Sequence, residues 1–168
     1  MPYSGTDSTT TAAERTLPLS LGRPGAVARS RRVAGAFLQD LEPDVPPMVR
    51  ETVALVVSEL VTNALRHAGG ACVLRLTAGT DHIDVFVHDS SSRPPRMRTP
   101  DLNGGAGGFG WPMIHRLATE VEITYDHRGG GKTVCARLSR TTDHCRGDEP
   151  DHDEIPGRGA GPAYSGTA

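Results

Sequence analysis

The sequence has no long apolar stretch and no strong net charge. Among its 168 residues there is no run of about 18 apolar residues, the length that a membrane-spanning helix requires. Residues 1–11 are polar and rich in threonine, without the apolar centre of a signal peptide. With 18 basic and 20 acidic residues, the net charge of -2 does not favour nucleic acid or membrane surfaces. These absences predict a cytoplasmic protein that binds neither of them directly.

Three residue types that often carry chemistry are scarce. The three cysteines, Cys72, Cys135 and Cys145, lack the close pairing of zinc or redox motifs, so no disulfide framework is implied. Lys132 is the single lysine in a chain that otherwise uses arginine, and an ammonium is not interchangeable with a guanidinium. One of only two asparagines, Asn63, stands inside a predicted helix, where asparagine has poor propensity. Its position therefore needs an explanation.

Composition divides the chain into a core region and two tails. Residues 1–15 and 140–168 are rich in glycine, proline, serine, threonine and aspartate, with almost no large apolar residues, which is typical of disorder. The acidic, histidine and cysteine residues within 143–153 match no defined metal-site spacing and are interpreted as solvated tail. Residues 16–139 are therefore predicted to form one domain.

Within the core region, hydrophobic periodicity predicts helices and strands in a definite order. The expected elements are a strand at 16–21, helices at 24–41 and 45–68, strands at 71–78 and 82–88, a helix at 111–118, and strands at 121–125 and 133–138. A long polar loop at 89–108 precedes the last helix. Because most strands are joined as hairpins, we predict an α+β fold: a two-layer α/β sandwich whose mixed, mostly antiparallel sheet is covered on one face by about three helices.

The helix at 45–68 carries a line of polar residues beside its apolar stripe. Glu59, Asn63 and His67 are each one helical turn apart, so their side chains emerge on the same side. A solvated polar face is the alternative interpretation. The apolar stripe, which is predicted to be core, comprises Val53, Val56, Val57, Leu60, Val61 and Ala64.

Two glycine-rich stretches resemble nucleotide-binding motifs without fulfilling them. Residues 105–110 satisfy GxGxxG but follow a polar loop rather than a strand, which argues against a Rossmann site. Residues 130–133 resemble a Walker loop, but its first glycine would fall on Asp126 and a strand follows instead of a helix. What remains is a glycine-rich segment before the helix at Trp111, whose N-terminal N–H groups favour phosphate. Glycines that merely permit tight turns are the alternative.

Taken together, these patterns resemble the GHKL, or Bergerat-fold, ATPases, and most closely the bacterial anti-sigma-factor serine/threonine kinases. The resemblance covers residues 16–139. The family's helix box is matched by Glu59, Asn63 and His67, and its adenine-binding aspartate at a strand end by Asp89. Ser91 stands where the family carries glycine.

The two later boxes of the family also have counterparts, in the expected order. The lid glycines before a helix resemble Gly107, Gly108 and Gly110, followed by Trp111-Pro112 where many relatives carry aliphatic residues. The final glycine-threonine box resembles Gly131 and Thr133. Four motifs in the order of the family support the resemblance more strongly than any one motif alone.

The resemblance implies ATP and Mg²⁺ as cofactors. Asn63 would be the metal ligand, because magnesium prefers oxygen ligands and keeps several waters, and Glu59 would be the catalytic base. Asp89, with Ser91, would bind adenine, and His67 or Arg66 would reach phosphate. Each role has an alternative. Glu59 could be a structural carboxylate, and Asp89 could be a turn-forming aspartate. His67 and Arg66 could simply face solvent.

Other cofactor-binding residues would lie on the phosphate side. The resemblance places Gly107, Gly108 and Gly110 in the lid. Lys132 and Thr133, at the turn before the last strand, would contact phosphate. Arg93, Arg96 and Arg98 would add positive charge to the lid, unless they are simply solvated.

The function implied is that of a serine/threonine kinase that phosphorylates a small antagonist protein and regulates transcription through a sigma factor. Relatives of this type bind a sigma factor and an anti-anti-sigma antagonist, usually as homodimers. Two alternatives stay open: a catalytically weak, nucleotide-sensing regulatory binding module, and an adaptor that binds no nucleotide.

Overall fold

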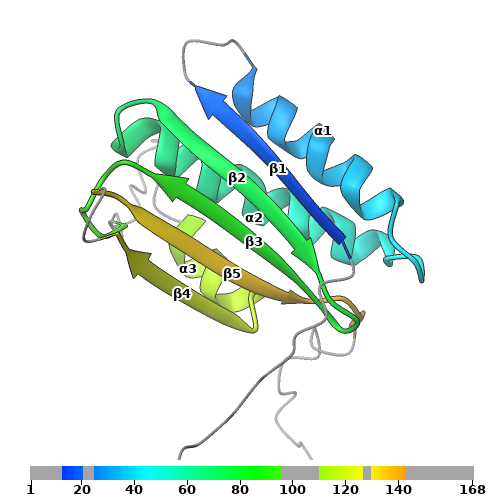
Figure 1. Cartoon of the computed structure of the whole chain (residues 1–168). Helices are drawn as coiled ribbons and strands as arrows, with labels where there is room; N and C mark the ends of the chain where they lie inside the picture. The colour runs from blue at the N-terminus through cyan, green and yellow to red at the C-terminus, as the bar shows by residue number, and fades with distance from the viewer. Residues whose placement is uncertain (1–12, 21–24, 96–109, 127–129, 143–168) are drawn as a thin grey trace, which may run out of the picture.

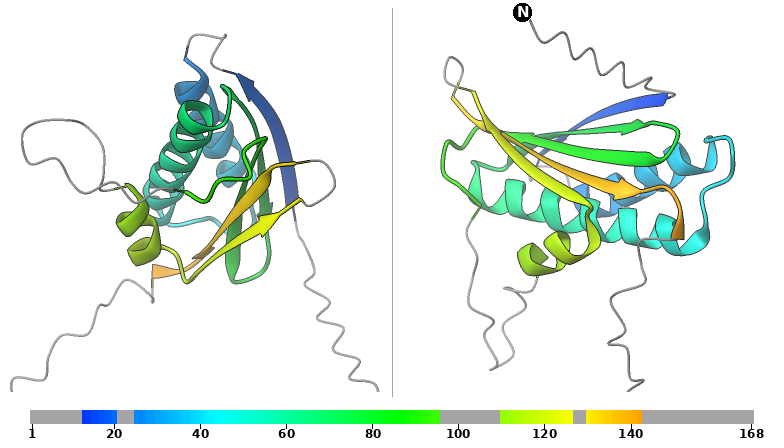
Figure 2. Two further views of the ribbon diagram at one scale, coloured as in Figure 1. Left: turned by 90° about the vertical axis from the view of Figure 1, so that its left-hand side faces the viewer. Right: turned by 90° about the horizontal axis from the view of Figure 1, so that it is seen from below.

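The protein forms a helical layer packed on a five-stranded sheet (Figure 1). The structure is a computed structural model that describes residues 13–20, 25–95, 110–126 and 130–142. The elements are β1 (Ala13–Ser20), α1 (Ala26–Gln39), α2 (Pro47–His67), β2 (Ala71–Ala78), β3 (His82–Asp89), α3 (Gly110–Leu117), β4 (Glu120–Tyr125) and β5 (Lys132–Ser139). Figure 2 shows the helices gathered on one side of the sheet, which confirms the predicted two-layer α+β fold. None of the helices in these ranges has the length and apolar character needed to cross a membrane.

The strands run in the order β1-β2-β3-β5-β4, and each of the pairings between them is antiparallel. The sequence predicted a mostly antiparallel sheet, and the described strands contain no parallel pair. Strand β5 lies between β3 and β4, so β3 is bracketed by β2 and β5. In this register Asp89, the last residue of β3, faces Cys72 on one side and Lys132 on the other.

Side-chain alternation gives the sheet one buried face and one without a helical cover. The predicted stripe of α2 is buried throughout and packs on the apolar residues of the sheet, which confirms it as core. Fully burying one such valine or leucine contributes about 1.5–3 kcal/mol relative to exposure. The sheet side of the core comprises Leu17, Leu19, Cys72, Leu74, Leu76, Ala78, Ile83, Val85, Val87, Val134, Ala136 and Leu138.

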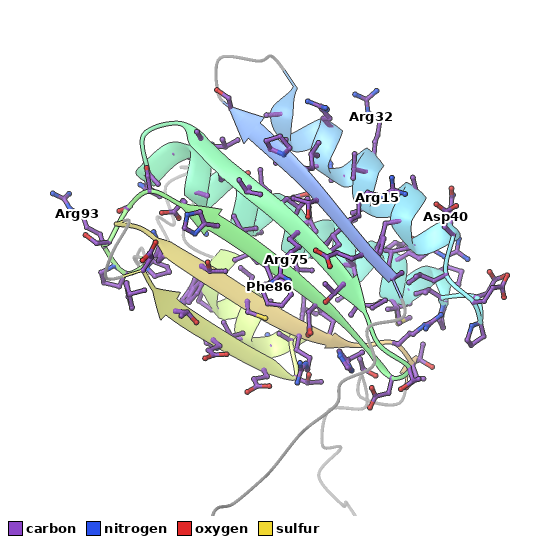
Figure 3. All side chains as sticks on the ribbon, in the orientation of Figure 1. Arg15, Arg32, Asp40, Arg75, Phe86 and Arg93 are labelled. Atoms are coloured by element: carbon purple, nitrogen blue, oxygen red, sulfur yellow. The ribbon has the colours of Figure 1, made fainter. Side chains whose placement is uncertain are left out.

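The second face of the sheet carries polar and aromatic pairs. The guanidinium of Arg75 lies 4.0 Å from the centre of the Phe86 ring, a cation–π contact between β2 and β3 (Figure 3). Arg137 donates two hydrogen bonds to the carboxylate of Asp84, at 2.8 and 3.1 Å. These contacts tie neighbouring strands together where no helix covers them.

The domain extends beyond the predicted boundaries at both ends. Strand β1 begins at Ala13, within the stretch assigned to the N-terminal tail. Arg140, assigned to the C-terminal tail, is buried and donates to the carbonyl oxygens of Gly79 and Pro43 at 3.0 and 2.6 Å. Its guanidinium therefore links the β2–β3 turn to the connection between α1 and α2.

Candidate functional site

The first part of the candidate site is a buried ion pair where β3 ends and β5 begins. The Lys132 ammonium donates to Asp89 Oδ1 at 2.8 Å, and the two side chains are 6% and 3% exposed. Lys132 also donates to the carbonyl oxygen of Ser91 at 3.2 Å, and the Ser91 N–H donates to Asp89 Oδ1 at 2.8 Å. These further hydrogen bonds offset part of the cost of desolvating two charges. We call Asp89, Ser91 and Lys132 the strand-end cluster.

Two contacts hold the strand-end cluster against neighbouring elements. Ser90 Oγ donates to the carbonyl oxygen of Ala68 at 3.0 Å, which places the end of β3 beside the end of α2. Gly131 has φ +136, and a Cβ atom there would lie 2.5 Å from the carbonyl oxygen of Asp89. Only glycine allows this turn to approach β3 so closely.

The second part of the site lies where α2 meets the beginning of α3. Glu59 and Asn63 are half-buried at the edge of the α2 stripe, one turn apart, as predicted. The Glu59 carboxylate rests on Gly110, the first residue of α3, so closely that a Cβ atom on Gly110 would overlap Glu59 Oε2. We call Glu59, Asn63 and Gly110 the helix cluster. Within the described residues the side chains of Glu59 and Asn63 make no hydrogen bond.

The helix cluster sets the Glu59 carboxylate at the N-terminus of α3. A helix N-terminus carries partial positive charge and favours anions, although Pro112 in the first turn of α3 has no N–H group. The single tryptophan, Trp111, follows Gly110 and packs edge-on against His115, with ring centres 5.1 Å apart. This contact lies within α3 and fixes its first turn.

Two of the predicted phosphate ligands lie on opposite faces of β5. Lys132 was expected at phosphate, but its ammonium is bound to Asp89 in the strand-end cluster. Thr133 points to the opposite face of the sheet, because side chains alternate along a strand, and its Oγ1 lies 3.1 Å from His88 Nδ1. The two residues therefore cannot act on the same side of β5.

The remaining predicted site residues are either exposed or outside the described residues. His67 is exposed at the end of α2, and no hydrogen bond or ion pair to a described residue links it to the candidate site. Arg93 is exposed beyond the end of β3 (Figure 3). Outside the described residues lie Gly107, Gly108, Arg96 and Arg98.

Sequence reasoning missed the ion pair between Lys132 and Asp89. The signal that pointed to it was the scarcity of lysine, since a single ammonium among arginines marks a position where a compact charge is needed. Asp89 and Lys132 are 43 residues apart, so only the pairing of β3 with β5 brings them together.

Both thiols in the described part of the sheet are held in their protonated form. Burial is the main cause that raises the pKa of Cys72 from 9.0 to about 11, and the charge of Asp89 adds to it. Burial, followed by the charge of Asp84, raises the pKa of Cys135 from 9.0 to about 11. Because the folded state holds these protons more tightly, the stability that they contribute is present below pH 9 and is lost as the pH rises toward 11.

Thiol labelling tests these pKa values. In a Cys145→Ser variant at pH 8, Cys72 and Cys135 should react slowly with a thiolate-selective reagent, and the rate should rise about tenfold per pH unit until about pH 11. Peptide mapping would follow each site. Asp89→Asn should speed the labelling of Cys72 and leave Cys135 unchanged. Fast labelling of both thiols at pH 8 would contradict their raised pKa values.

Comparison with known proteins gives a family match and several similar solved structures. The family model described as the histidine kinase-like ATPase domain matches residues 22–138, more than half of the chain. No curated protein matches the sequence significantly.

One similar solved structure is the crystal structure of the RsbU and RsbW domains of Rv1364c from Mycobacterium tuberculosis. It matches with a TM-score of 0.55 and 18% sequence identity over 77% of this chain. The match covers 33% of that protein, so this chain spans about a third of its length. At this identity the likeness confirms the fold.

Proposed function

Because the chain belongs to the histidine kinase-like ATPase domain family, we propose that it is an ATP- and Mg²⁺-binding serine/threonine protein kinase of the anti-sigma-factor type. It transfers the γ-phosphoryl group to a small antagonist protein in the cytoplasm and so regulates transcription through a sigma factor. Its partners are the sigma factor and the antagonist, and it acts as a homodimer without touching nucleic acid. The observation that carries the proposal is the Glu59 carboxylate resting on Gly110 at the N-terminus of α3, with Asn63 one turn away.

The two clusters suggest how the nucleotide lies. The Asp89 carboxylate in the strand-end cluster accepts a hydrogen bond from the amino group of adenine. The triphosphate then extends to the helix cluster, where the N–H groups of α3 and its dipole stabilise negative charge. Ser90, hydrogen-bonded to the end of α2, keeps the two clusters on adjoining elements.

The donors present fit magnesium. The described residues contain no group of three histidine, cysteine, aspartate or glutamate side chains that could form a metal cage. Mg²⁺ in phosphoryl-transfer sites commonly takes only one or two protein oxygens, and the substrate phosphates and water supply the rest. Asn63 Oδ1 would hold it, and the bound ion would neutralise charge on the phosphates.

Glu59 would handle the proton of the transfer step. The substrate hydroxyl oxygen forms a bond to the γ-phosphorus while the bond between that phosphorus and the β–γ bridging oxygen breaks, and ADP leaves. The hydroxyl proton passes to the Glu59 carboxylate. The contact with Gly110 positions this carboxylate beside the anion-attracting end of α3.

A transfer assay tests the proposal. Purified protein, Mg²⁺ and γ-labelled ATP are incubated with candidate antagonist proteins, and label is expected on a serine or threonine of one of them. Asn63→Ala should abolish Mg²⁺-dependent ATP binding in calorimetry and remove the label. Thr52→Ala is the matched control on α2, because its hydroxyl bonds only to the Met48 carbonyl oxygen on the exposed side of the helix. ATP binding without transfer to any candidate would contradict the kinase role.

A second candidate function is favoured by the strand-end cluster itself. Ser91 replaces the glycine of the family pattern, and Lys132 already occupies Asp89 Oδ1. A nucleotide-sensing regulator that holds its partner with little catalysis would show ATP-dependent partner binding that survives Glu59→Ala in full. Absence of ATP binding would instead favour an adaptor.

A further inference from the structure

We propose that Lys132 contacts the base of the bound nucleotide directly, so that Asp89 and Lys132 together read one edge of adenine. This inference rests on the proposed function, because it requires an adenine nucleotide at the strand-end cluster. It assigns to Lys132 a specificity-determining contact with the base in place of the phosphate contact expected from the sequence.

The hydrogen-bond inventory of Lys132 leaves one donor for a ligand. An ammonium has three N–H groups. Two are used, by Asp89 Oδ1 at 2.8 Å and the Ser91 carbonyl oxygen at 3.2 Å, and no other described residue accepts the third. The side chain is only 6% exposed, so water has little access to this group. A buried donor without a partner is costly, and a ligand acceptor would satisfy it.

Asp89 supplies the complementary acceptor. Its Oδ1 atom already accepts from Lys132 and from the Ser91 N–H, whereas Oδ2 has no hydrogen bond from a described residue. The cluster thus presents a carboxylate acceptor beside an ammonium donor. Adenine offers the matching pattern, because its exocyclic amino group is a donor flanked by ring nitrogens that accept. The amino group would face Asp89, and the neighbouring ring nitrogen, N1 or N7, would accept from Lys132.

The position of Lys132 in the sheet keeps it beside Asp89. It lies on the helix-covered side of β5, as Val134 and Ala136 do, and directly opposite Asp89 in the register. The alternative role for Lys132 is that of a counter-ion that only neutralises Asp89. Such a purely structural lysine would affect all adenine analogues equally, which separates the two roles experimentally.

A double-mutant-type cycle tests the contact: it combines a Lys132 variant with ATP analogues that each lack one ring nitrogen of adenine. Binding of ATP, 1-deaza-ATP and 7-deaza-ATP, each with Mg²⁺, is measured by calorimetry for the wild type and for Lys132→Met. In the wild type one analogue should bind about tenfold more weakly than ATP, the loss expected for a hydrogen bond to a charged group. In Lys132→Met this difference should disappear, because the donor is gone.

The outcomes distinguish this inference from the proposed function. Equal analogue penalties in the wild type and in Lys132→Met, or no penalty in either, would overturn the contact while ATP binding stands. Failure of the wild type to bind ATP would overturn the proposed function and the inference with it. Lys132→Gln, which keeps an uncharged donor, provides a second variant should Lys132→Met unfold, and it should retain part of the analogue penalty. Thermal unfolding of each variant verifies the fold.

Discussion

In the Gly110→Ala variant, phosphoryl transfer is expected to fall about 100-fold while the protein stays folded. The added methyl group would occupy the space of Glu59 Oε2. Because this atom is the far end of a flexible side chain, the carboxylate can swing away at little cost in stability. It would then no longer lie beside the N-terminus of α3, where the proton must be received.

Two further variants make the Gly110 result interpretable. Glu59→Gln keeps the shape of the side chain and removes its basicity, so it should lower transfer by about 10²–10⁴-fold with ATP affinity unchanged. Gly35→Ala is the matched glycine control, since a Cβ atom at Gly35 meets nothing within 4 Å. It should leave transfer unaltered and stabilise α1 by about 0.5–1 kcal/mol. If Gly110→Ala transferred phosphate at the wild-type rate, the location of Glu59 would not matter for catalysis.

Replacing Asp89 with alanine is expected to have the largest effect on stability. The free energy of unfolding, measured by urea titration, should fall by about 3–5 kcal/mol, because the buried Lys132 ammonium loses its charged partner. ATP affinity should fall as well, since the adenine amino group loses its acceptor. Adding Lys132→Met to Asp89→Ala should restore part of the stability, because no buried charge is then left unpaired. It should not restore the ATP affinity, because the acceptor for the adenine amino group is still missing.

An exposed ion pair serves as the control for the Asp89 result. Arg15 and Asp40 lie 3.7 Å apart with side chains 53% and 71% exposed (Figure 3). Asp40→Ala should change the unfolding free energy by less than about 1 kcal/mol. Equal losses for Asp40→Ala and Asp89→Ala would mean that burial of the second pair has no energetic consequence.

The sequence predicted the helices, the hairpins and the helix cluster because these depend on local spacing. Helical periodicity places Glu59 and Asn63 on one edge of α2 whatever the tertiary structure of the rest of the chain. The same applies to the alternation of β2 and β3 around their turn. The family resemblance then suggested that Gly110 belongs to the same site, and its contact with Glu59 agrees with that expectation.

The pairing of distant strands could not be predicted from local patterns. Nothing near Lys132 in the sequence indicates that β5 lies next to β3, and the glycine-threonine box directed the interpretation toward phosphate. The ordered residues beyond the predicted domain ends could not be predicted for a related reason. Ala13 belongs to an edge strand, where polar residues are common, and Arg140 is buried through hydrogen bonds to carbonyl oxygens that composition cannot reveal.

The insertion of β5 between β3 and β4 has a consequence for biosynthesis. Asp89 is translated well before its partner Lys132, 43 residues later. Contacts of such long range form late, because chain closure must precede them. A nascent chain that has not yet released β5 therefore lacks Lys132, the cationic member of the strand-end cluster. Nucleotide capture would then mark the completion of folding and stabilise only chains that have closed the sheet.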